Sequence, residues 1–135
     1  LVVVGGGPQL EQLQRSAKPH IQFRTWVGAR ELRELYRHAR GFVFTAQEDY
    51  GIAPIEAQAC GCPVLAFGRG GVRETVRDGE TGLFFSEQSA ESLIEGLDRF
   101  SAHKFDAEAI RANAVRFNPQ RFREEFLACL SRVIS

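Results

Sequence analysis

Short apolar runs alternate with helical patterns along the whole chain of 135 residues. The apolar runs have the length and the β-branched and aromatic composition of buried strands, and they occupy residues 1–4, 21–23, 41–45, 63–67 and 82–85. Apolar residues recur at helical spacing over residues 10–17, 32–39, 54–60, 72–76, 89–100, 106–117 and 119–134. Because parallel strands need crossover connections, this alternation predicts an α/β fold with one doubly wound, Rossmann-like parallel sheet, in a single domain over residues 1–135.

Several expected helix ends carry residues that favour a start or a stop. Asp106 and Asn118 are the expected N-caps of the last two helices, because their side chains can accept bonds from first-turn N–H groups. Pro54 suits the first turn of its helix, where an N–H group has no helical partner. Gly41 and Gly61 are expected to end the helices that precede them.

Three loops follow strands, at the ends where doubly wound sheets bind ligands. The first, Gly5 to Pro8, matches a dinucleotide-binding fingerprint poorly, because Leu10 stands where the third glycine belongs. No acidic residue stands about twenty positions further on to bind a ribose. A tight strand-to-helix turn with open backbone is the better interpretation of this loop.

The second loop leads from residue 46 into the helix that contains Pro54, and it has the outline of an anion site. Gly51 lets a ligand approach the backbone, and the first-turn N–H groups beside Pro54 are left free. Glu56 could accept bonds from two vicinal hydroxyls of a ribose, or it could be a capping carboxylate. Glu48 could reach a sugar, or it could be an ordinary exposed loop acid.

The third loop, residues 68–71, is a second candidate anion site. It offers N–H groups of Gly70 and Gly71 that no side chain encumbers, with Arg69 and Arg73 nearby. A plain connection is the alternative. In the loop after the second strand, Trp26 to Gly28 could flank a planar base, although a core or wall residue is the default for a tryptophan.

Charge and composition exclude several classes of function. Seventeen basic residues balance seventeen acidic ones, so the chain lacks the positive field on which nucleic-acid binding depends. Residues 78–98 carry six acidic side chains and no basic one, so an anion site should lie elsewhere. No segment approaches the ~20 apolar residues that a membrane span needs.

The cysteines and histidines favour neither a disulfide scaffold nor a metal site. Cys60, Cys62 and Cys129 are an odd number without a signal peptide, which fits a reducing cytoplasm. The C-x-C pair lacks nearby ligands for zinc, so buried free thiols are expected. The three histidines have no spacing that suggests a catalytic triad. An apolar start without methionine indicates a fragment of a longer protein.

The ordered motifs resemble the C-terminal half of retaining, group 1 glycosyltransferases, the family-4 enzymes of GT-B architecture. The motifs that carry the likeness are residues 48–57, 59–64, 70–76 and 79–84. A weaker likeness extends from Val2 to about Phe85, and only helical character matches beyond it. The resemblance implies a domain that binds a nucleoside diphosphate sugar.

The resemblance also implies roles for individual residues. Glu48 and Glu56 match the E-x7-E motif, whose first glutamate touches the donor sugar and is the expected catalytic residue, and whose second holds the ribose. The backbone at Gly51, Ile52 and Ala53 would support sugar and phosphate. The remaining expected donor-binding residues are Gly5, Gly6, Gly7, Val27, Gly28, Tyr50, Gly70 and Gly71. Tyr50 stands where the family usually has phenylalanine, and an aromatic ring is kept.

The family reaction transfers the sugar with retention and needs no obligatory metal or other cofactor, and the leaving diphosphate helps to deprotonate the acceptor. The family places an arginine and a lysine on a strand and loop that precede the first strand of this chain. Its N-terminal domain binds a glycan or lipid-linked acceptor. The resemblance therefore implies a fragment that lacks the first strand of the domain and that transfers no sugar alone.

Residues 49–52 and 67–71 are most similar to bacterial mannosyltransferases of surface polysaccharide assembly, which favours GDP-mannose as the donor. UDP-sugars stay open. Two other functions also stay open, a sugar-nucleotide-binding module without catalysis and a GT-B sugar-nucleotide epimerase. We expect a cytoplasmic protein, with contact to the inner membrane face through the acceptor domain as an open alternative.

Overall fold

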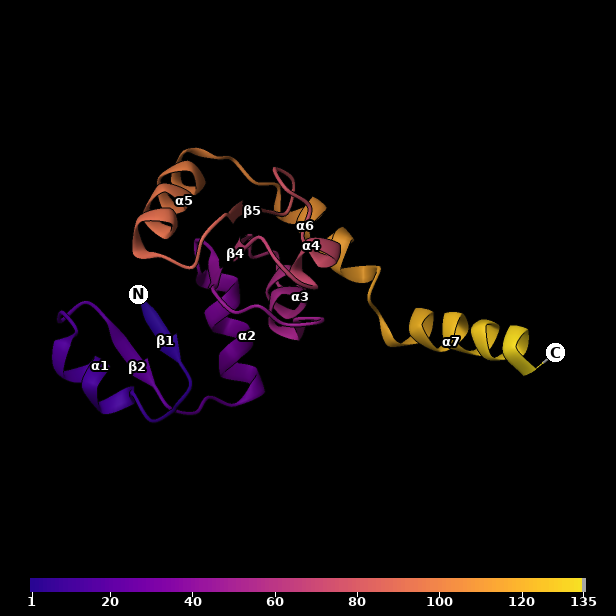
Figure 1. The fold of residues 1–135 in the computed structure, drawn as a ribbon, viewed down its shortest axis with the longest axis horizontal. Helices are drawn as coiled ribbons and strands as arrows, with labels where there is room; N and C mark the ends of the chain where they lie inside the picture. The colour runs from indigo at the N-terminus through magenta and orange to yellow at the C-terminus, as the bar shows by residue number, and fades with distance from the viewer. Residues whose placement is uncertain (135) are drawn as a thin grey trace. The chain divides into compact units, whose positions relative to one another are not determined.

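The structure is a computed structural model that describes residues 1–134. The chain falls into two compact units, Leu1–Leu35 and Tyr36–Ser135, and each has its own parallel sheet. Figure 1 labels the elements by their number in chain order, except β3. Helix α2 (Ala29–His38) crosses the boundary between the units in sequence, and each unit is described by itself.

The first unit holds two short strands joined by one helix. Strand β1 (Val2–Val4) pairs in parallel with β2 (Gln22–Arg24), and α1 (Leu10–Ser16) connects them. The ladder continues past β1, because the Gly5 N–H donates to the Arg24 carbonyl at 2.9 Å. The glycine-rich loop therefore begins directly at the carboxyl end of β1.

The second unit is built on a three-stranded sheet in the order β3 (Phe42–Phe44), β4 (Val64–Phe67) and β5 (Gly82–Phe85). Both pairings are parallel. All four residues of the central strand β4 are buried, as expected for a parallel strand covered on both faces. Helix α3 (Ile52–Ala59) connects β3 to β4, and α4 (Val72–Thr75) connects β4 to β5.

The core of the second unit lies under α5 (Ala90–Ala102), which packs against β4 and β5. The core cluster consists of Leu65, Phe67, Leu83 and Phe85, with Leu93, Phe100 and Phe105 packed against it. Gly96 lets α5 approach the sheet closely, since a β-carbon there would lie 3.2 Å from the Phe85 β-carbon. Elsewhere in the unit, α3 packs against α6 (Ala107–Val115) and α4.

Helix α7 (Pro119–Ile134) differs from the other helices of the second unit because none of its residues is buried. Its exposed large apolar residues are Phe122, Phe126, Leu127, Leu130, Val133 and Ile134. Among the helices of residues 1–134, none has both the length and the apolar character to cross a membrane.

The structure confirms the predicted strands and helices, with shifts of a few residues at some ends. It also confirms both predicted N-caps. The Asp106 carboxylate accepts from the Glu108 N–H at 2.9 Å, and the Asn118 side-chain carbonyl accepts from the Arg121 N–H at 2.9 Å. Capping side chains act on the next few residues, so sequence alone is enough to locate such helix starts.

The two glycines predicted to stop helices differ. Gly61 follows α3 with a φ of 79°, and its N–H donates to the Gln58 carbonyl at 2.8 Å, which confirms it as a helix stop. The prediction for Gly41 was wrong, because α2 ends at His38 and Gly41 has no positive φ. A β-carbon at Gly41 would overlap the Phe100 ring, so tertiary packing is what requires glycine there.

The expectation of one continuous sheet also needs correction. The α/β class and the parallel pairing are as predicted, but the strands form two sheets, β1-β2 and β3-β4-β5. Apolar runs locate strands without showing which strands are neighbours, because pairing depends on backbone groups that every sequence shares.

Candidate functional site

The N-terminus of α3 carries neither a capping side chain nor a neutralising acid of its own. Gly51 is its N-cap, with a φ of 79° that side-chain-bearing residues rarely adopt. No side chain caps the helix, and its first turn contains no acidic residue. The first-turn N–H groups of an α-helix have no helical acceptor, so this end of α3 offers donors and a partial positive charge to an anion.

The loop before α4 lies against the loop before α3. The Gly71 N–H donates to the Glu48 carbonyl at 2.8 Å. Gly70 has a φ of 76°, and a β-carbon there would overlap the Glu48 carbonyl oxygen. A β-carbon at Gly71 would overlap the Asp49 carbonyl oxygen. The structure thus brings together the two candidate anion loops of the second unit, at the carboxyl ends of β3 and β4.

Both glutamates of the E-x7-E motif are exposed and accessible to a ligand. Glu48 lies in the loop, whereas Glu56 is the fifth residue of α3, just beyond its first turn. Glu56 does not cap α3, which removes the capping interpretation. Burial, and secondly the charge of Glu56, raises the pKa of the Tyr36 hydroxyl to about 12, so these two side chains interact electrostatically.

Aromatic and basic side chains border the two loops. The Tyr50 ring is 51% exposed and meets the Phe117 ring edge-on, with centroids 6.5 Å apart. Arg69 lies over the Phe67 ring at 5.8 Å, and Arg73 donates to the Gly68 carbonyl at 3.2 Å. Both guanidinium groups remain exposed, so they add positive charge beside the loop before α4.

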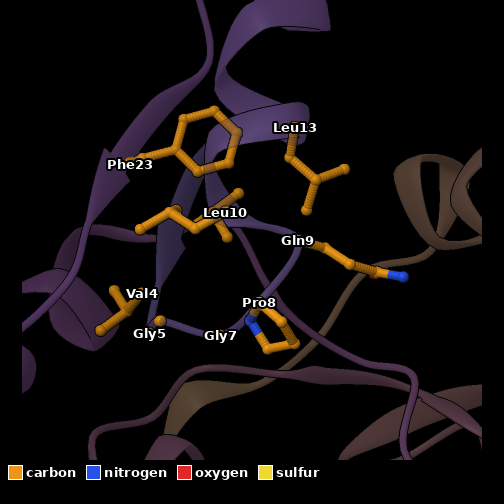
Figure 2. Close-up of a pocket in the computed structure, with 10 residues that line it drawn as sticks. Val4, Gly5, Gly7, Pro8, Gln9, Leu10, Leu13 and Phe23 are labelled. Atoms are coloured by element: carbon orange, nitrogen blue, oxygen red, sulfur yellow. The ribbon is translucent and has the colours of Figure 1, made fainter.

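In the first unit, the glycine-rich loop borders an apolar pocket of about 310 Å³ (Figure 2). The pocket extends from this loop to the side chains of Leu10, Leu13 and Phe23. A β-carbon added at Gly5, Gly6 or Gly7 would meet nothing within 4 Å. The backbone of this loop is therefore open, as the interpretation of a turn with accessible N–H groups expects.

The loop after β2 contains the other expected donor-binding residues of the first unit. Val27 and Gly28 are half-buried, and Trp26 beside them is 81% exposed. A β-carbon at Gly28 would lie 3.6 Å from the Trp26 ring. An indole this exposed is not a core residue, so of the two default interpretations of Trp26 only that of a wall residue remains.

The sequence analysis missed three buried polar residues behind the site. Gln58, Thr75 and Asn113 are at most 3% exposed, and their side chains and backbone groups bond to one another. The available signal was an amide within an apolar helical stripe, as at Gln58 beside Ala57. An amide in such a stripe is predicted to be buried, but the pattern does not identify its hydrogen-bond partner.

The cysteines belong to no metal-binding cluster in the part of the chain that the structure describes. Cys60, Cys62 and Cys129 form no disulfide bond within residues 1–134. Among residues 1–134, no group of three or more His, Cys, Asp and Glu side chains could hold a metal ion.

Comparison with solved structures defines the class of fold. The apo lipopolysaccharide outer core galactosyltransferase WaaB matches 98% of this chain with 40% of its own, at a TM-score of 0.80 and 17% identity. The structure of Anabaena Alr3699/HepE in complex with UDP-glucose matches 97% of this chain with 40% of its own, at a TM-score of 0.69 and 22% identity. The fold is that of the GT-B glycosyltransferases, as predicted.

The family follows from the sequence comparisons. The chain belongs to the family of glycosyl transferases group 1, whose model matches residues 1–117. The GDP-mannose-dependent alpha-(1-6)-phosphatidylinositol monomannoside mannosyltransferase of Mycolicibacterium smegmatis (strain ATCC 700084 / mc(2)155) is 41% identical over 110 residues, which cover 72% of this chain and 29% of that protein. The chain therefore spans less than a third of the length of that relative, and the predicted family is confirmed.

Proposed function

We propose that the chain is the donor-binding domain of a retaining hexosyltransferase, which moves a hexose from a nucleoside diphosphate sugar to a glycan or lipid-linked acceptor. The observation that carries this proposal is the contact between the loops before α3 and α4, in a chain of the group 1 family. Free N–H groups at the start of α3 suit the negative charge of a diphosphate.

The proposed roles of the residues follow their positions in the second unit. The Glu56 carboxylate would accept bonds from the two ribose hydroxyls, because it is exposed one turn into α3. The backbone of Gly51, Ile52 and Ala53 would bind the diphosphate and the sugar. Glu48 would contact the donor sugar as the catalytic residue, and Gly70 and Gly71 would complete the wall opposite α3.

In the proposed reaction, the bond from the sugar C1 to the diphosphate oxygen breaks. A bond from C1 to the acceptor oxygen forms on the same face of the sugar. The leaving nucleoside diphosphate takes up the proton of the acceptor hydroxyl, so the step balances without a metal ion. The contribution of the protein is to orient the donor and to stabilise the charge that develops on the leaving diphosphate.

GDP-mannose is the donor that we favour. The mannosyltransferase of Mycolicibacterium smegmatis, which is 41% identical to this chain, carries GDP-mannose dependence in its name. A UDP-sugar is the alternative, because Anabaena Alr3699/HepE has the same fold and holds UDP-glucose.

The acceptor side of the reaction belongs to parts of the protein outside this chain. We propose that an N-terminal domain binds the acceptor, and that a preceding strand and loop supply an arginine and a lysine for the diphosphate. The chain alone would then bind a nucleotide weakly and transfer no sugar. Cysteines that form no disulfide among residues 1–134 fit a reducing cytoplasm, where we place the reaction.

A titration of the full-length protein with GDP, UDP, ADP and GDP-mannose tests the proposal. A nucleotide at 100 times its dissociation constant stabilises a protein by ~2.7 kcal/mol, which a thermal-shift measurement detects. We expect one nucleotide to stabilise selectively, and we expect Glu56→Ala to reduce that shift. Glu95→Ala is the matched control, because it removes an exposed carboxylate of α5.

Product analysis then separates the candidate functions. Transfer of radiolabelled mannose to a glycan or lipid acceptor supports the hexosyltransferase. Nucleotide binding without transfer would favour an inactive module, and an altered sugar nucleotide would favour an epimerase. The proposal is wrong if no nucleotide changes the melting temperature of the full-length protein.

A further inference from the structure

A closed network of amide hydrogen bonds lies behind the candidate site. The Gln58 side-chain amide donates to the carbonyls of Pro54 and Thr75, at 3.1 Å each. The Asn113 amide donates to the Gln58 side-chain oxygen at 2.7 Å and to the Thr75 carbonyl at 2.8 Å. This network joins the first turn of α3, the last residue of α4 and the buried face of α6.

Each side-chain amide in the network has a single orientation in which its NH2 group and its oxygen both have hydrogen-bond partners. Both Gln58 donors and both Asn113 donors are used, and Arg116 donates to the Asn113 side-chain oxygen at 2.8 Å. A rotated Asn113 would point its oxygen at the Thr75 carbonyl oxygen, and both groups are buried. A satisfied buried network is rigid, and it fixes the relative positions of the elements that carry it.

The element that depends most on this network is α4. It has four residues, and a single helical turn is not stable by itself. Its front end is held where the Gly71 N–H meets the Glu48 carbonyl at 2.8 Å. Its rear end is held where the Thr75 carbonyl accepts from two amides. Gln58 and Asn113 therefore tie the rear end of α4 to α3 and to α6.

The segment directly after α6 contacts the loop of the E-x7-E motif. The guanidinium of Arg116, which bonds to Asn113, lies over the Phe117 ring at 5.4 Å. The Phe117 ring in turn meets the edge of the Tyr50 ring at 6.5 Å. Helix α6 thus contacts α4 through Asn113, and the segment directly after α6 contacts Tyr50 through Phe117.

From these contacts we propose that Asn113 and Gln58 are positioning residues, which hold the loop of residues 68–71 at the distance from α3 that a nucleoside diphosphate sugar requires. Neither side chain touches the ligand, because both are buried behind the site. The inference rests on the proposed function, since it gives the network a role in donor binding as well as in stability.

The test replaces Asn113 in the full-length protein and measures the Kd for GDP and for UDP. Asn113→Leu keeps the approximate size of the side chain and removes its hydrogen bonds. A small displacement of binding groups has large effects on ligand geometry, so we expect the Kd of the preferred nucleotide to rise about 10-fold. In kinetic assays the KM for the donor should rise while the KM for the acceptor stays unchanged.

The matched control is Ile110→Ala, one turn earlier on α6. Ile110 is fully buried, so this change destabilises the same helix without removing an amide bond. We expect it to lower the melting temperature and to leave the Kd near the wild-type value. Hydrogen exchange at the Gly71 amide gives a second readout, which should accelerate in Asn113→Leu and not in the control.

If Asn113→Leu does not fold, Gln58→Met replaces it, because this change keeps the bond from Asn113 to the Thr75 carbonyl. An unchanged Kd in a folded variant, or an equal rise in the Ile110→Ala control, overturns the positioning role alone. If the wild-type protein binds none of GDP, UDP and ADP, the proposed function is wrong and the positioning role falls with it.

Discussion

The two units use glycine after a strand in opposite ways. In the first unit, added β-carbons at Gly5, Gly6 and Gly7 would meet nothing within 4 Å. In the second unit, added β-carbons at Gly70 and Gly71 would overlap backbone oxygens of the neighbouring loop. Glycine in the first loop leaves open space beside the backbone. Glycine in the loop before α4 lets that loop pack directly against the loop before α3.

The units also differ in their cores. No residue from 1 to 35 is buried, whereas Ala57, Val64, Leu65 and Ala66 of the second unit are fully buried. Hydrophobic stabilisation follows the apolar area removed from water, so the second unit provides most of it. The difference teaches that two glycine-rich loops of one chain can follow strands that are buried to very different extents.

The largest effect should come from the core of the second unit. Leu65→Ala creates a cavity under α5, and we expect it to lower the free energy of unfolding by about 2–5 kcal/mol. Val3→Ala, at a half-buried position of the first unit, should cost about 1 kcal/mol. Urea unfolding monitored by circular dichroism measures both, and equal losses would contradict the difference between the cores.

The glycine loops give the next contrast. Gly71→Ala forces the loop before α4 away from Asp49, and overlap of this kind costs about 3 kcal/mol. Gly6→Ala should change stability by less than about 0.5 kcal/mol, because the added methyl group enters open space. The same unfolding measurement applies, and a Gly71→Ala protein with wild-type stability would show that the contact between the loops is not required.

The rates of amide hydrogen exchange should also distinguish the two units, without any substitution. Amides of β1 and β2 should exchange with solvent about 10-fold faster or more than amides of β4, because exchange follows local burial. Hydrogen-exchange mass spectrometry of peptides 1–24 and 60–70 makes this comparison. Equal protection of the two peptides would contradict it.

The smallest expected effect is a loss of stability at alkaline pH. It is confined to the second unit, since residues 1–35 contain neither tyrosine nor cysteine. Burial, and secondly the charge of Cys60, raises the pKa of Cys62 from 9.0 to about 12. Burial, and secondly the charge of Glu56, raises that of Tyr36 from 10.0 to about 12. In both groups the fold favours the neutral form, which is also the form present below pH 9.

The stability that these two groups provide is therefore complete below their unfolded pKa values and is lost as the pH rises from 9.0 toward about 12. The urea concentration at the midpoint of unfolding should therefore fall as the pH rises from 8 to 11.5. Tyr36→Phe and Cys62→Ala should each flatten the decline, and a decline that neither change alters would assign it to other groups.

Sequence alone predicted the features that depend on neighbouring residues. Asp106 and Asn118 cap the helices that follow them, and Gly61 ends α3, because each acts within one helical turn. The loops of residues 46–53 and 68–71 were also located correctly at strand ends. The roles of Glu48 and Glu56 in donor binding stay predictions.

Features that join distant parts of the chain could not be predicted. Gln58 and Asn113 are 55 residues apart in sequence, and no periodic pattern links two amides on different helices. Gly41 has the local context of a helix stop, but its actual neighbour is the Phe100 ring. The separation of the strands into two sheets likewise depends on pairing that apolar runs do not encode.

The exposed face of α7 has a practical consequence for handling the chain in solution. Its large apolar residues, from Phe122 to Ile134, are all open to solvent, and the isoelectric point of the chain is near 7.0. At neutral pH, molecules with an exposed apolar stripe and no net charge have little electrostatic repulsion to keep them apart. Preparations of this chain will therefore stay dispersed best in buffers well away from neutrality and at low protein concentration.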